Sequence, residues 1–78
     1  MTKVRVTSLV RMANSKSGNP QYILNTASGM VLHTKPDSTV GYVAQALEQY
    51  LLDGNPSVST EITLDKDGMV TRLLGYGD

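Results

Sequence analysis

The chain lacks cysteine, tryptophan and phenylalanine, and it holds a single histidine, His33. Without cysteine, neither a disulfide nor a thiolate metal site can supplement the small core that a chain of 78 residues buries. No apolar run approaches the roughly 18 residues of a membrane span, and the N-terminal segment lacks the continuous apolar stretch of a signal peptide. We therefore expect one soluble, cytoplasmic domain over residues 1–78 that makes no membrane contact.

Acidic residues are absent from the first half of the chain. Residues 1–36 carry five lysines and arginines and no acid, a formal charge of +5, whereas residues 37–78 carry two such cations against seven acids, a formal charge of −5. Folding can turn this split into a basic face and an acidic face, or it can interleave the two halves into an ordinary mixed surface. The sequence leaves both alternatives open.

The first predicted strand covers residues 3–12 and changes phase midway. Its polarity alternates, but Leu9 falls out of phase with Val4 and Val6, which predicts a bulge near residues 7–8 that bends the strand. The next segment, NSKSGNPQY, contains a glycine and a proline that break any strand ladder, because proline lacks the N–H donor. We expect this segment to be a hairpin loop first, and a binding loop only if the basic half of the chain gathers around it.

A second hairpin is predicted from residues 21–26 and 30–34, around the three-residue loop Ala-Ser-Gly. In this register Leu24 lies opposite Leu32 on the core side, and Ile23 lies opposite His33 on the solvent side. The register therefore separates a core face from a mixed, solvent-facing surface.

The second half of the chain predicts one helix and two strands. Asp37 or Ser38 can cap a helix that runs to about Leu52 with its apolar residues at helical spacing. The segment DKDG then joins strands over residues 60–64 and 69–74. A two-residue turn would pair Ile62 with Leu73, whereas a three-residue turn would pair Leu64 with Val70, and the sequence does not decide between these registers.

The order strand, strand, strand, helix, strand, strand is typical of a small OB-type barrel, in which the helix lies between the third and fourth strands. The predicted fold class is therefore mainly β, a five-stranded OB-like barrel with one helix. The alternative is an open antiparallel sheet with the helix across one face, which is an α+β arrangement.

Catalytic and metal-binding chemistry is not indicated. The single His33 has no evident partner, and DKDG lacks the ligand spacing and the bidentate glutamate of a calcium loop. The segment SKSGNP lacks the glycine-lysine pair of a phosphate loop and is followed by a strand. We expect no enzymatic activity, no catalytic residue, no metal and no cofactor.

Binding is therefore the predicted activity. In OB-type barrels the second and third strands, with the loops beside them, form the usual site for single-stranded nucleic acid or oligosaccharide. The candidate binding residues are Arg5, Arg11, Lys16, Asn19, Gln21, Ile23, His33 and Lys35.

Two classes of partner compete for this surface. Lysines and arginines can meet the phosphates of a single strand, but the aromatic platforms on which its bases would stack are scarce. Ile23 and Val31, exposed among polar neighbours, suit a modest protein interface with a host protein or with a second copy of the chain. We expect protein–protein interaction first and single-stranded nucleic acid as the alternative.

The runs VTSLVRMANSKSGNPQYILNTASG, TKPDSTVGY and EITLDKDGMVTRL resemble short uncharacterised proteins that are common in actinobacterial phages and prophages. These carry a GNP element with a nearby tyrosine after a basic first strand, then a threonine-rich stretch that leads to a Gly-Tyr or Ala-Tyr pair. The matching positions are Gly18, Asn19, Pro20, Tyr22, Thr34, Asp37, Ser38, Gly41 and Tyr42. The resemblance implies a phage accessory protein in the cytoplasm of the host cell, and it supplies no catalytic residue.

Overall fold

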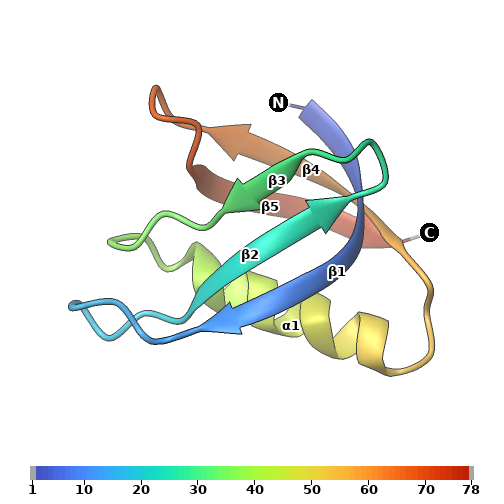
Figure 1. Ribbon diagram of the computed structural model, residues 1–78, viewed down its shortest axis with the longest axis horizontal. Helices are drawn as coiled ribbons and strands as arrows, with labels where there is room; N and C mark the ends of the chain where they lie inside the picture. Colours follow the sequence, from blue (N-terminus) through green and yellow to red (C-terminus); the bar gives the residue numbers. More distant parts are fainter. Residues whose placement is uncertain (1, 78) are drawn as a thin grey trace.

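The computed structural model describes residues 2–77, with side chains as far as Leu74, and contains one antiparallel sheet and one helix (Figure 1). The elements are β1 (Thr2–Met12), β2 (Gln21–Thr26), β3 (Val31–His33), α1 (Val40–Leu52), β4 (Val58–Leu64) and β5 (Val70–Gly77). The strand order in the sheet is β3-β2-β1-β4-β5. The mainly β class, with five strands and one helix in the predicted order, is thereby confirmed.

β1 is the central strand, and its two halves pair with different neighbours. Residues Thr2–Val6 pair with β4, whereas Val6–Met12 pair with β2. The register shifts between Val6 and Ser8, so the predicted bulge is confirmed. The inserted residue reverses the phase of the strand, which is why Leu9 lies opposite Leu24 and packs against the core.

The β2–β3 hairpin has the predicted register, with Leu24 opposite Leu32 and Ile23 opposite His33. Gly29 closes the turn at a φ of 89°, in the left-handed region where a side chain would be strained. The inner face of the hairpin is buried and its outer face is open to solvent.

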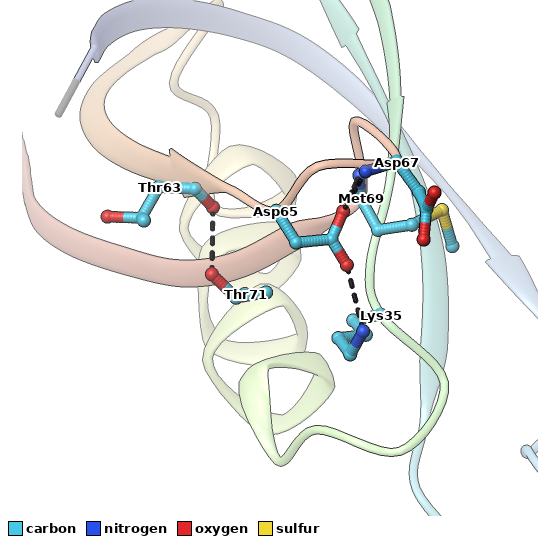
Figure 2. Close-up of polar contacts among 6 residues, drawn as sticks. All are labelled: Lys35, Thr63, Asp65, Asp67, Met69 and Thr71. Carbon is cyan, nitrogen blue, oxygen red and sulfur yellow. Dashed lines mark hydrogen bonds and ion pairs between the residues drawn. The ribbon is translucent and has the colours of Figure 1, made fainter.

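The β4–β5 hairpin combines both registers that the sequence left open. Leu64 pairs with Val70 next to the turn, and Ile62 pairs with Leu73 further along. A bulge between these pairs makes them compatible, and the Thr71 hydroxyl there donates to the Thr63 carbonyl at 3.2 Å (Figure 2). The two registers are therefore not exclusive alternatives, because one inserted residue in β5 allows both pairs to form in the same hairpin.

α1 ends at Leu52 as predicted but begins later than either predicted cap. Its N-cap is Thr39, which makes no side-chain capping bond. The Ser38 hydroxyl accepts the N–H of Val40 at 3.2 Å and still satisfies one amide of the first turn. The helix buries Val40, Ala44 and Leu47 in the core against the inner face of the sheet, and Gly41 against Pro20.

The core lies between α1 and the inner face of the sheet. Its buried apolar residues are Val4, Val6, Tyr22, Leu24, Leu32, Val40, Ala44, Leu47, Val58, Ile62, Val70 and Leu73. The sheet is not closed by a continuous ladder. Among the described residues its two edges meet only in an isolated parallel bridge between Thr34 and Val70, where the Lys35 N–H donates to the Val70 carbonyl at 2.9 Å. The open sheet therefore fits, and the predicted barrel is not confirmed.

The β1–β2 loop packs directly on the start of α1. Pro20 is buried, and a Cβ placed on Gly41 would lie 1.8 Å from the Pro20 carbonyl oxygen. Only a glycine allows the helix backbone to approach so closely. Gly41 and Pro20 thus fix where α1 meets the β1–β2 loop.

Candidate functional site

The outer face of β1, β2 and β3 carries three exposed apolar side chains, Val10, Met12 and Val31, around the half-buried Ile23. Cross-strand pairing places Val10 opposite Ile23, and Ile23 opposite His33. Met12 and Val31 are the diagonal neighbours of Ile23 on the same face. We name the apolar patch for its four residues, Val10, Met12, Ile23 and Val31, of which Val10 and Val31 are 50% and 55% exposed.

Val10 and Met12 reach this face because of the bulge in β1. Before the bulge, Val4 and Val6 point into the core; after it, Leu9 points inward and Val10 and Met12 point outward. Both residues were missing from the predicted site. The signal was present in the sequence, since the same phase change that predicts the bulge also turns residues 10 and 12 toward solvent.

Three predicted binding residues lie on this outer face: Gln21, Ile23 and His33. Gln21 lies opposite Met12 and donates its side-chain amide to the Ala13 carbonyl at 3.1 Å. His33 is exposed beside Ile23 on the edge strand β3. Gln21 and His33 give the apolar patch a polar rim.

The predicted cations do not gather around the patch. Arg5 lies in the half of β1 that pairs with β4, where its guanidinium donates to the Ser57 hydroxyl at 2.8 Å. Arg11 lies six residues away, about 20 Å along the strand, and covers the Tyr22 ring at 5.3 Å. Lys16 is exposed in the β1–β2 loop. The five-cation half of the chain therefore spreads over the molecule.

Arg11 and Asn19 are engaged in local structure. The Arg11 guanidinium donates to the Met12 and Gln21 carbonyls and to the Asn14 side chain. The Asn19 side-chain amide donates to the Pro36 carbonyl at 3.3 Å and so ties the β1–β2 loop to the turn before α1. Asn19 was expected to be free for contact, and it instead holds two loops together.

Lys35 forms an ion pair with Asp65 at 2.8 Å that joins the end of β3 to the β4–β5 turn (Figure 2). The other carboxylate oxygen of Asp65 accepts the backbone N–H groups of Asp67 and Met69, each at 2.9 Å. The bonds from Lys35 and from Met69 hold the pKa of Asp65 below its ordinary value, and the hydrogen bond to Asp65 raises the pKa of Lys35. Lys35 thus connects the two sheet edges.

A pocket of about 360 Å³ lies on the other side of β1, toward α1. We call it the edge pocket; it is lined by Thr7, Ser8, Leu9, Glu48, Leu51, Leu52, Asn55 and Pro56. The Tyr22 hydroxyl donates to the Glu48 carboxylate at 3.1 Å. Burial, followed by this bond to Glu48, raises the pKa of Tyr22. No pattern in the sequence predicts this pocket, because its walls come from segments about 40 residues apart in the chain.

The described residues contain no group of three histidine, cysteine or acidic side chains placed to hold a metal ion. None of the helices in the described part of the chain is long and apolar enough to cross a membrane. Comparison with models of protein families, with curated proteins and with solved structures gives no match. The resemblance to short phage proteins stays a prediction.

Proposed function

We propose that this protein is a small non-enzymatic binding module that contacts a partner protein through the apolar patch on the outer face of β1, β2 and β3. One observation carries the proposal: Val10, Met12, Ile23 and Val31 share one solvent-exposed face on three adjacent strands. Interface cores are enriched in apolar side chains and poor in charge, with a polar rim around them. This face has that arrangement, with Gln21 and His33 beside the apolar residues.

The proposed partner carries apolar side chains with acidic residues around them. Residues 1–36, which form all three strands of the face, contain no acid. The exposed cations Lys3 and Arg5 alternate with the inward-facing Val4 and Val6, so they lie on the same outer face of β1 as the patch. The proposed source is a host protein, or a second copy of the chain that docks head to tail with the acidic residues of its segment 37–78, in the cytoplasm of the host cell that the phage resemblance implies. Charge of opposite sign would speed association and set its orientation.

Single-stranded nucleic acid is the weaker alternative. Single-strand binders stack bases on aromatic side chains, and the apolar patch contains none. Of the predicted phosphate contacts, Lys35 is ion-paired and Arg5 lies on the far half of β1.

The test compares a Val10→Ser, Val31→Ser double variant with wild type and with a matched Leu64→Ser, Leu74→Ser double variant. Leu64 and Leu74 are 39% and 40% exposed but lie on β4 and β5. Sedimentation velocity from 10 μM to 1 mM, about the range of weak interfaces, measures self-association, and capture from host extract measures binding to other proteins. We expect the wild type to show self-association or binding to a host protein, the patch variant to lose that activity, and the control variant to retain it.

Three outcomes contradict the proposal. The wild type remains a monomer and captures nothing; or the patch variant and the control behave alike; or labelled single-stranded oligonucleotide binds with an affinity that falls steeply as salt rises, which is the sign of phosphate contacts. The third outcome would support single-stranded nucleic-acid binding as the function instead.

A further inference from the structure

The edge pocket lies where β1 loses one of its partners. β4 pairs with β1 only from Thr2 to Val6, so the edge of β1 beyond Val6 faces the C-terminal half of α1 and the loop that follows it. Figure 1 shows α1 running beneath this half of β1 before the chain turns back to β4. The pocket is therefore a consequence of the strand order, and its walls belong to two separate segments, residues 7–9 and 48–56.

The walls of the edge pocket combine an apolar surface with one charge. Leu9 and Leu51 are half-buried and pack against the core, while Leu52 is 72% exposed. Glu48 is the only charged residue in the lining. A volume of about 360 Å³ lies within the range of small-molecule sites, which are mostly apolar with a few placed polar groups.

Glu48 is held in place but lacks a cation. Its Oε1 accepts the Tyr22 hydroxyl at 3.1 Å, which fixes the carboxylate from the core side. The ion pair found among the described residues is the one between Lys35 and Asp65, so Glu48 forms none within them. A half-buried, oriented carboxylate beside leucine side chains is a site for an opposite charge that arrives on an apolar stem.

The other polar side chains of the pocket, Thr7, Ser8 and Asn55, each make a hydrogen bond within the protein. The Thr7 hydroxyl donates to the Asn25 carbonyl, and the Ser8 hydroxyl accepts the Asn25 side-chain amide at 3.0 Å. The Asn55 side-chain amide donates to the Tyr50 carbonyl at 2.7 Å. These bonds stiffen the walls, and the Glu48 carboxylate, as the one charged group of the lining, is the group that selects the ligand.

We propose that the edge pocket binds an aliphatic chain that ends in an ammonium or guanidinium group. The cation pairs with Glu48, and the methylene groups cover Leu9, Leu51 and Leu52. Both a small alkylamine and a lysine or arginine side chain of another polypeptide have this chemistry. The proposal is independent of the apolar patch, since Val10, Met12, Ile23 and Val31 do not line the edge pocket.

The test is a titration of ¹⁵N-labelled protein with hexylamine, hexanoate and hexanol, followed by NMR. We expect hexylamine to shift the amide signals of Leu9, Leu51 and Asn55 with a Kd in the millimolar range, about what a ligand of seven heavy atoms can reach. Hexanoate and hexanol should bind at least about tenfold more weakly. A blocked Gly-Lys-Gly peptide distinguishes the two sources: binding by the peptide as well as by hexylamine identifies a polypeptide side chain, and binding by hexylamine alone identifies a small amine.

Two variants keep the test decisive. Glu48→Gln retains an oxygen that can accept the Tyr22 hydroxyl but removes the charge, so hexylamine should bind at least about tenfold more weakly than to wild type, the effect of one lost charge pair. Leu52→Ser changes an exposed residue and should weaken binding a few-fold without unfolding the chain. Glu61→Gln, an exposed carboxylate on β4, is the matched control and should leave binding unchanged.

The proposal is overturned if hexanol or hexanoate binds as well as hexylamine, if Glu48→Gln binds hexylamine like wild type, or if the shifted amides lie outside the edge pocket. Binding that is lost equally in Glu61→Gln would also overturn it, because the effect would then come from overall charge. None of these results depends on whether the apolar patch binds a partner.

Discussion

Gly41→Ala should destabilise the protein, although the same exchange inside a helix normally stabilises it. Alanine is favoured over glycine by about 1 kcal/mol in a helix interior, and that is the upper bound of the gain at Gly41, the second residue of α1. Here the added Cβ would lie 1.8 Å from the Pro20 carbonyl oxygen and 2.7 Å from its carbon, and real contacts of this kind do not fall below 3.0 Å. Helix and loop would have to separate by more than 1 Å, and both atoms involved belong to backbone.

Forcing a methyl group into a packed site costs about 1 to 3 kcal/mol, and the rigid carbonyl of Pro20 places this case at the upper end. After the propensity gain is subtracted, the expected loss is about 2 kcal/mol of the roughly 4 to 12 kcal/mol that a domain of this size has. Urea unfolding followed by circular dichroism should show a midpoint lower by about 1 to 2 M.

The matched control is Ala46→Gly at an exposed position of α1. It should lose about 1 kcal/mol from helix propensity alone, which establishes the normal sign of the exchange in this helix. A Gly41→Ala variant as stable as wild type, or more stable, would refute the proposed contact between α1 and the β1–β2 loop.

Two further predictions concern hydrogen bonds that join distant segments. Tyr22→Phe removes the bond to Glu48 and should lower the free energy of unfolding by about 1 kcal/mol in urea titrations; unchanged stability would mean that this bond contributes nothing. Asp65→Asn should be less stable than wild type at neutral pH. Because the folded pKa of Asp65 is lowered and that of Lys35 is raised, the difference should disappear as pH falls below about 4 and again as it rises above about 10. A difference that is constant from acid to alkaline pH would contradict the ion pair as its source.

Local pattern predicted the elements well, because the features that define them are local. The phase change at Leu9 located the β1 bulge, and glycine with a short turn located the β2–β3 register. The start of α1 was misplaced because Thr39 provides no side-chain cap and Ser38 acts from one residue earlier.

The parts that the sequence did not predict depend on segments far apart in the chain. The edges of the sheet meet at Thr34 and Val70, and the edge pocket needs Glu48 beside Leu9; no periodicity encodes either contact. The charge split between the two halves of the chain did not decide between separate basic and acidic faces and a mixed surface. Folding places Lys35 on Asp65, and so pairs a cation of the first half with an acid of the second.

The apolar patch is tested most directly by photocrosslinking from a single position. The chain has no cysteine, so Val31→Cys and the control Leu64→Cys each carry one reactive thiol to which a benzophenone maleimide can be attached. On irradiation, alone at high concentration and in host extract, the label at position 31 should give a discrete protein adduct and the label at position 64 should not. Adducts from position 64 only, equal adducts from both positions, or none from either would contradict protein binding through the apolar patch.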